Sequence, residues 1–114
     1  MKNRISDNER LLHIIDAIDS ISDFTLDISY KDYIEDFKLR LALIKLLEII
    51  GEAANGITEE TQLRFSEVEW ILLKSIRNVL VYEYFGIDYD IIWNAIKDRI
   101  PELKLKISSV LLRL

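Results

Sequence analysis

The amino-acid sequence predicts an all-α protein, built as an up-down bundle of four to five helices. Apolar residues recur at three- and four-residue spacings along most of the chain, which is the period of a helix with one buried face. Valine and isoleucine are plentiful, but they nowhere alternate with polar residues over the length of a strand. Three glycines and one proline leave few breaks, and 114 residues fit a single helical domain spanning residues 1–114.

The first helix is predicted to run from Asp7, which we expect to cap it, to about Ser22. Its core-facing stripe consists of six apolar residues: Leu11, Leu12, Ile14, Ile15, Ile18 and Ile21. The stretch 23–29 mixes Asp, Thr and Ser, a composition typical of a connection between two helices.

A long second helix is predicted from about Tyr30 to Asn55. Its apolar residues fall on one face at helical spacing: Leu39, Ala42, Leu43, Leu46, Leu47, Ile50 and Ala54. Gly56 follows directly, and a glycine in the left-handed C′ conformation is a common way to end a helix. The residues Thr58 to Thr61 are expected to begin a loop or a short helical turn.

The third helix is predicted to begin at Ser66 or Glu67 and to end at about Tyr84, before Gly86. Ser66 followed three residues later by Glu69 has the form of a capping box.

Two further helices complete the predicted bundle. Asp88 is expected to cap a fourth helix that ends at about Arg99, and a fifth is expected from Glu102 to Leu112. Pro101 would lie near the first helical position of the fifth, where the missing N–H of proline is tolerated.

A helical wheel of the third helix has a predicted core stripe and an opposite polar face. The stripe consists of Leu72, Ile76, Val79 and Leu80, within an arc of about 100°. The opposite face carries Lys74, Arg77, Asn78, Val81, Tyr82, Tyr84 and Phe85. Apolar residues interleaved with polar ones would suit a face packed on a second copy of the chain, although they could equally meet other helices of the same bundle.

Composition excludes several kinds of site. The chain has no cysteine, and therefore no disulfide, thiol nucleophile or cysteine-based zinc site. Its net charge of −5 lacks the overall basic character of most nucleic-acid-binding domains, so RNA would need a local basic cluster or a partner subunit. Neither a signal peptide nor a membrane span is evident, and we expect a cytoplasmic protein without a membrane contact.

The segment Arg77-Asn78-Val79-Leu80-Val81-Tyr82-Glu83-Tyr84 resembles a motif of the HepT-type toxins in the HEPN ribonuclease superfamily. Those proteins carry R-N/D-x-x-x-H-x-Y near the end of an internal helix, followed by a turn like Phe85-Gly86-Ile87-Asp88 here. Residues 47–55 resemble the family's second-helix signature, and residues 91–93 and 101–103 resemble its closing helices. The resemblance covers most of the chain and implies a HEPN-like helical homodimer.

The resemblance also implies a reaction and its residues. In the family, arginine and histidine from two subunits meet in one cleft, and RNA is cleaved without a metal or other cofactor by attack of its own 2′-OH. Arg77 would stabilise charge on the phosphate, and Asn78 would orient it. Tyr82 occupies the histidine position, and a phenol with a pKa near 10 is a poor general base at pH 7. The chain is therefore expected to be a weak or inactive nuclease.

Other ionisable residues receive simpler interpretations. His13, the single histidine, lies on the predicted first helix, matches no motif and is expected to be partly exposed. Glu52, Glu67 and Glu69 are expected to be solvated helix residues rather than catalytic groups.

Tyr84 matches the motif tyrosine, and the resemblance implies that it accepts AMP from a partner nucleotidyltransferase, the MNT antitoxin. Negative charge there would block an RNA phosphate from reaching Arg77. An alternative is a non-catalytic helical module that binds a nucleotidyltransferase or a nucleotide. The acidic charge and the missing histidine favour that alternative, whereas the other motif positions favour the nuclease. A purely structural bundle would leave Arg77 and Asn78 without a role.

Overall fold

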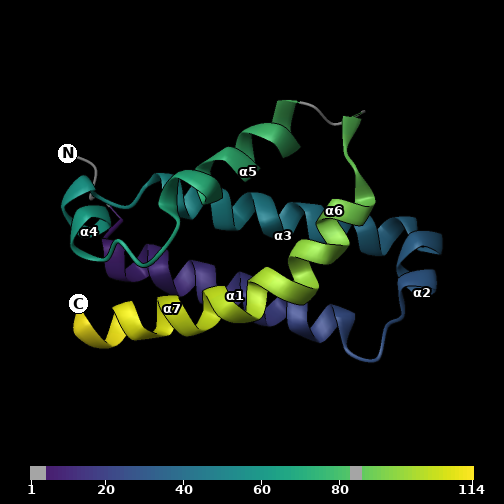
Figure 1. Cartoon of the computed structure of the whole chain (residues 1–114), viewed down its shortest axis with the longest axis horizontal. Coiled ribbons are helices and arrows are strands. Elements are labelled where there is room, and N and C mark those ends of the chain that lie inside the picture. Colours follow the sequence, from purple (N-terminus) through teal and green to yellow (C-terminus); the bar gives the residue numbers. More distant parts are fainter. Residues whose placement is uncertain (1–4, 83–85) are drawn as a thin grey trace.

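The computed structural model describes residues 5–82 and 86–114, and every regular element within them is helical. The predicted all-α fold is confirmed for this part of the chain. The long helices α1 (Asp7–Thr25), α3 (Phe37–Asn55), α5 (Trp70–Tyr82) and α7 (Ile100–Arg113) lie along one another (Figure 1). Helix α1 begins, and α7 ends, at the end of the bundle that carries the short α4 (Glu59–Arg64).

The sequence predicted that Asp7 caps α1, but this prediction was wrong. The cap is Ser6. Ser6 Oγ accepts a hydrogen bond from the Glu9 N–H at 3.1 Å. The Asp7 carboxylate instead accepts from the Thr58 N–H at 3.0 Å and from the hydroxyls of Thr58 and Thr61, each at 2.6 Å. Asp7 thus joins the start of α1 to the start of α4, which Thr58 caps. Such long-range partners for a capping-type residue cannot be seen in a local sequence pattern.

The predicted second helix is in fact two helices, α2 (Tyr30–Glu35) and α3. They are separated at Asp36, whose backbone is extended (φ −110°, ψ 94°) and whose carboxylate caps α3 by accepting from the Leu39 N–H at 3.0 Å. Arg40 Nη1 donates to backbone carbonyls at the end of α2. Helical spacing of apolar residues continues across the break, so periodicity alone could not locate it.

Gly56 ends α3 where the sequence predicted, but its conformation is not left-handed (φ −87°, ψ −7°). A side chain at this position would overlap the guanidinium of Arg10, which lies 2.2 Å from an ideal Cβ. Glycine here makes room for a close side-chain approach instead of supplying a positive φ.

Helix α5 begins at Trp70, later than predicted, and the Ser66–Glu69 capping box is not formed. Residues 65–68 form a turn whose members Phe65 and Val68 are buried. The indole N–H of Trp70 donates to the Phe65 carbonyl at 3.0 Å and holds this turn against the helix.

Asp88 caps α6 (Tyr89–Asn94) as predicted, accepting from the N–H groups of the two residues Asp90 and Ile91. The predicted gap after Arg99 is absent, because a π-helical turn η2 (Ala95–Arg99) joins α6 to α7. Pro101 lies in the first turn of α7. A wider turn just before a proline is physically reasonable, since the ring cannot donate the hydrogen bond that an uninterrupted α-helix requires.

Tyr33 attaches the short α2 to α6. Its side chain is fully buried, its hydroxyl donates to the Tyr89 carbonyl at 2.7 Å, and its ring centroid lies 4.7 Å from that of Trp93. Burial raises the pKa of Tyr33 to about 12, so the hydroxyl keeps its proton and this hydrogen bond at neutral pH. None of the helices within residues 5–82 and 86–114 is long and apolar enough to cross a membrane.

Candidate functional site

The buried face of α5 differs from the predicted one by roughly a quarter turn. Trp70, Leu73 and Leu80 are buried, whereas Leu72, a member of the predicted core stripe, is 43% exposed. Arg77 follows Leu73 by one helical turn, so it lies at the edge of the buried face and not opposite the core. The helix has two apolar sides, and its wheel does not say which side meets α3.

Arg77 lies directly on Gly51 of α3. A Cβ built on Gly51 would be 2.5 Å from the Arg77 Cβ and 2.9 Å from the Leu73 carbonyl oxygen. Contacts as short as these do not occur between real side chains, so α3 and α5 can approach this closely only because residue 51 is glycine. The tertiary structure thus brings residues 47–55 and the Arg77-Asn78 segment together.

The guanidinium of Arg77 has two side-chain partners. Its Nε lies 2.5 Å from Glu52 Oε2 in an ion pair, and its Nη1 donates to Asn78 Oδ1 at 3.3 Å. The Arg77 side chain is 31% exposed and that of Glu52 is 60% exposed, so the pair lies at the surface, where a ligand can reach it.

Glu52 is an exposed residue of α3, as expected, and it is also ion-paired with Arg77. Glu67 and Glu69 are ion-paired as well, with Arg113 and Arg99. The signal that pointed to Glu52 was its position beside Gly51 in the second-helix signature. Its partner could not be known before the packing of α3 on α5 was known.

The other predicted site residues are placed as follows. Asn78 is exposed beside Arg77, and Tyr82 is the last residue of α5. The side chain of Tyr82 and the whole of Tyr84 lie outside the described residues, so their proposed roles stay predictions. His13 is exposed on α1, as expected.

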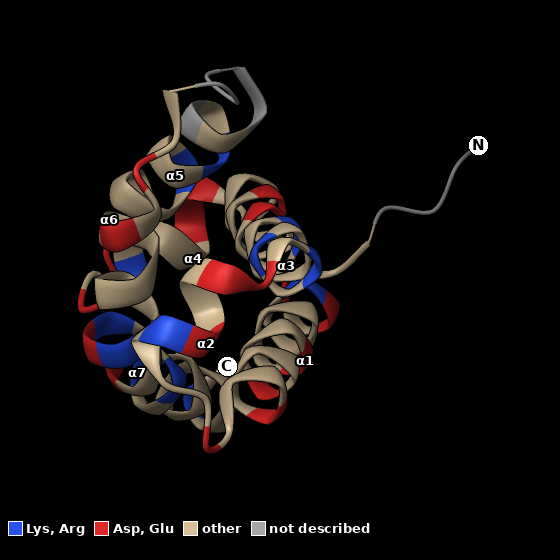
Figure 2. Ribbon diagram, turned by 90° about the vertical axis from the view of Figure 1, so that its right-hand side faces the viewer, with Lys and Arg blue, Asp and Glu red and all other residues tan. Residues whose placement is uncertain are grey.

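Charges around Arg77 are mixed. Lys74, one turn before Asn78, donates to Gln62 Oε1 at 3.0 Å, and Lys45 on α3 lies 3.7 Å from Glu48. Figure 2 shows acidic and basic residues distributed over most of the helices, and Lys104 on α7 pairs with Asp19 on α1 at 2.7 Å. Any attraction of the chain for a phosphate therefore depends on Arg77 and its immediate neighbours rather than on a large basic surface.

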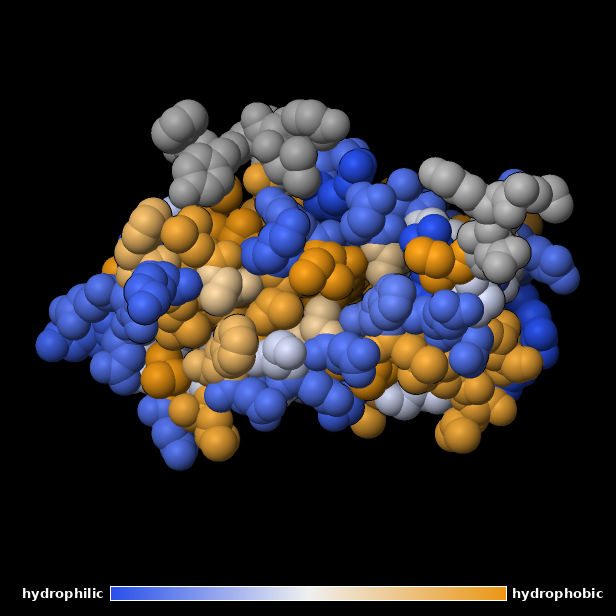
Figure 3. Space-filling model, turned by 180° about the vertical axis from the view of Figure 1, so that it is seen from behind, coloured by the Kyte–Doolittle hydropathy of each residue, from blue (hydrophilic) through white to orange (hydrophobic). Residues whose placement is uncertain are grey.

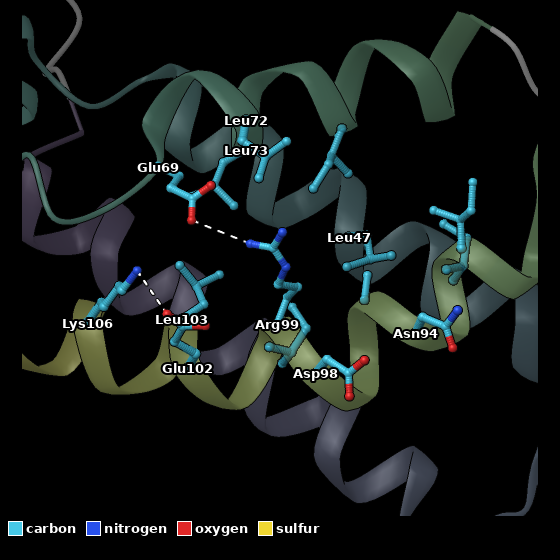
Figure 4. Close-up of a pocket in the computed structure, with 15 residues that line it drawn as sticks. Leu47, Glu69, Leu72, Leu73, Asn94, Asp98, Arg99, Glu102, Leu103 and Lys106 are labelled. Atoms are coloured by element: carbon cyan, nitrogen blue, oxygen red, sulfur yellow. Dashed lines mark hydrogen bonds and ion pairs between the residues drawn. The ribbon is translucent and has the colours of Figure 1, made fainter.

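Apart from the surface ion pair, an apolar groove of about 380 Å³ is present between α5 and the helices from α6 to α7 in the described part of the chain (Figure 4). Its apolar walls include Leu47, Leu72, Ile76, Ile91 and Leu103. Four charged groups at its rim are paired, Arg99 with Glu69 at 3.5 Å and Lys106 with Glu102 at 3.2 Å. Leu72 and Ile76, predicted to be core residues, thus line a groove that is open to solvent.

Apolar side chains are also exposed elsewhere on the molecule. The face seen from behind carries several apolar patches between hydrophilic ones (Figure 3). On α5 itself, Ile71 is 79% exposed. Ile71 and Asn78 are seven residues apart and share one side of the helix, so an apolar residue extends the exposed side that carries Asn78.

Comparison with known families gives one assignment for most of the chain. Residues 14–110 match the family described as Ribonuclease HepT-like. The matched region contains Gly51, Glu52, Arg77 and Asn78, the residues that meet between α3 and α5.

Individual proteins are similar over nearly their full lengths. A Methanocaldococcus jannaschii protein named "Putative RNase" is 36% identical over 100 residues, which cover 88% of this chain and 92% of that protein. A Thermococcus cleftensis protein named "Probable ribonuclease HepT" is 35% identical over 105 residues, covering 92% and 96%. A "Putative RNase" of Caldanaerobacter subterraneus is 36% identical over 101 residues, covering 89% and 90%. No solved structure matches the chain at a significant level.

Proposed function

This chain belongs to the HepT-like ribonuclease family, and from that premise we propose that it is the toxin of a two-component toxin–antitoxin pair. Its reaction is metal-independent cleavage of RNA, slow in this chain because tyrosine stands at the histidine position. The observation that supports this most directly is the placement of Arg77 and Asn78 together at the surface of α5, within the region that matches the family.

The proposed chemistry is an internal transfer at one RNA phosphate. The 2′-oxygen attacks the adjacent phosphorus, its proton passes to a base, the bond to the 5′-oxygen breaks, and that oxygen receives a proton. The products carry a 2′,3′-cyclic phosphate and a 5′-hydroxyl. Arg77 stabilises the charge that develops on the phosphate oxygens, because forked N–H donors suit phosphate geometry. A neutral phenol at residue 82 is a poor acceptor for the 2′-proton at pH 7.

We propose further that two copies form one cleft, lined by Arg77 and Tyr82 of each. The exposed Ile71, on the same side of α5 as Asn78, supports a covered face here, since large exposed apolar residues beside a polar site are typical of interfaces. Static light scattering at micromolar concentration should give twice the mass of the chain, and a monomer would contradict the shared cleft.

The direct test is RNA cleavage in EDTA by the native chain, by Arg77→Ala and by Arg99→Ala. The native chain should release cyclic-phosphate ends slowly, and Arg77→Ala should reduce this rate by about 10²–10³-fold, as expected when a charge-stabilising donor is lost. Arg99→Ala is the matched control, because Arg99 is also an exposed arginine paired with a glutamate. Equal loss in both variants would show that Arg77 has no special role.

Neutralisation by a nucleotidyltransferase antitoxin is the last part of the proposal. With that enzyme and ATP, AMP should be attached to Tyr84, and less readily to Tyr82. The modification would neutralise the toxin, because an added phosphate near Arg77 would occupy the place of the RNA phosphate. Intact mass and peptide mapping should show one AMP on the native chain and much less on Tyr84→Phe. Unchanged labelling of Tyr84→Phe would remove Tyr84 from the scheme.

A non-catalytic helical module for a nucleotidyltransferase or nucleotide is the second candidate. The net charge of −5, together with the carboxylate of Glu52 beside Arg77, favours it. It would be supported if the antitoxin bound the chain tightly while neither the native protein nor its Tyr82→His variant cleaved RNA.

A further inference from the structure

We propose that Glu52 is a positioning residue that holds the guanidinium of Arg77 in the orientation needed to receive an RNA phosphate. The inference rests on the proposed ribonuclease function and adds to it a residue from a different helix. It is carried by the contacts that two successive residues of α3 make with the two ends of the Arg77 side chain.

The base of the Arg77 side chain is immobilised by Gly51. The Arg77 Cβ occupies the space that a side chain of residue 51 would fill, 2.5 Å from the ideal Cβ position. The backbone of α5 at Leu73 and Arg77 also touches this point. Because the helices are in contact here, the Cα and Cβ of Arg77 cannot shift without separating α5 from α3.

The far end of the same side chain is held by Glu52. An arginine has several rotatable bonds beyond Cβ, so a fixed base alone leaves its guanidinium free to sample many orientations. The Nε to Glu52 Oε2 contact of 2.5 Å selects among them. The attraction of the two opposite charges at this short distance draws the Nε side of the guanidinium toward Glu52 and restricts its orientation.

The edge that Glu52 occupies determines which edge remains for a ligand. A guanidinium can present paired N–H groups through Nε with one Nη, or through its two Nη atoms. Since Glu52 lies beside Nε, a phosphate would be met by the Nη1–Nη2 edge. Asn78 Oδ1 accepts from Nη1 at 3.3 Å on this edge, so the amide lies where it can move aside for a phosphate or contact it directly.

The Glu52 carboxylate must also have an unfavourable effect, and this makes the proposal testable. A negative charge beside Arg77 repels RNA before the reaction, so Glu52 should weaken RNA binding while it accelerates cleavage. A residue that only stabilised the fold would not change these two quantities in opposite directions.

The test compares Glu52→Ala, Glu52→Gln and the control Glu48→Ala, in the native chain and in a Tyr82→His background. Glu48 is one turn earlier on α3 and is paired with Lys45, so its loss changes net charge equally without touching Arg77. Under single-turnover conditions Glu52→Ala should bind RNA about 2- to 5-fold more tightly, as expected for one surface charge, yet cleave it about 10- to 100-fold more slowly. Glu52→Gln, which can still accept from Nε, should recover most of the cleavage rate.

A readout independent of RNA separates this inference from the proposed function. In ¹H–¹⁵N spectra the Nε–H of Arg77 should exchange slowly with water in the native chain and in Glu52→Gln, but rapidly in Glu52→Ala. Slow exchange with no RNA cleavage by any variant would overturn the ribonuclease proposal, and with it the catalytic purpose of Glu52. Active RNA cleavage that Glu52→Ala leaves unchanged would overturn the inference alone.

Discussion

Replacing Tyr82 by histidine should increase metal-independent RNA cleavage by about 10²–10⁴-fold, the usual contribution of a well-placed general acid–base group. Imidazole titrates near neutral pH and can therefore accept the 2′-proton and return a proton to the leaving 5′-oxygen. A phenol keeps its proton at pH 7 and supplies little of this. Tyr82 is the last residue of α5, five residues after Arg77, so the substitution lies at the end of that helix.

Three control variants define the result. Arg77→Ala in the Tyr82→His background should return the rate to the native level or below, since the phosphate charge needs a fixed cation whichever group acts as base. Tyr82→Phe should be as slow as the native chain, which would show that the phenol contributes little. His13→Ala should not matter, because His13 is exposed on α1 and lies outside the motif.

The measurement is the rate of appearance of cyclic-phosphate ends in EDTA, with oligomeric state checked by light scattering for each variant. Growth arrest on expression of Tyr82→His, absent for the Arg77→Ala double variant, would be the corresponding result in cells. A folded, dimeric Tyr82→His protein that leaves RNA intact would refute the nuclease proposal and leave the binding module in its place.

Gly51→Ala should destabilise the protein by about 1–3 kcal/mol, although alanine is normally favoured over glycine inside a helix by about 1 kcal/mol. The new Cβ would lie 2.5 Å from the Arg77 Cβ and 2.9 Å from the Leu73 carbonyl oxygen. The second contact involves backbone, so rotation of a side chain cannot relieve it and α5 must move away from α3. Overpacking therefore outweighs helix propensity at this position.

Gly86→Ala is the matched control, because nothing in the described residues lies within 4 Å of a Cβ built there. Urea denaturation should show a clear loss of stability for Gly51→Ala and little change for Gly86→Ala. The displacement of α5 should also separate Arg77 from Glu52, so RNA cleavage should fall in Gly51→Ala even at temperatures where it stays folded. Equal stability of the two variants would contradict the proposed tight crossing of α3 and α5.

Local patterns in the sequence were sufficient for the helical class and for several boundaries. Gly56 ends α3 where predicted, although through a close approach of Arg10 and not a left-handed conformation. Asp88 caps α6 where predicted, because a cap acts on backbone N–H groups within a few residues. The Arg77-Asn78 segment was identified through its resemblance to a family motif, which the sequence alone displays. The break at Asp36 and the late start of α5 at Trp70 were missed, because apolar periodicity continues through or near both.

The sequence by itself therefore determined an all-helical chain, the ends of α3 and α6 and the residues of the motif. Only the tertiary structure decided which side of α5 is buried, and hence that Arg77 lies on Gly51 and pairs with Glu52. The physical reason is that α5 carries apolar residues on more than one side, and its sequence pattern does not show which side is buried. Which side of α5 is buried depends on which helix can approach α5 most closely. Helix α3 can do so because residue 51 is a glycine and has no side chain.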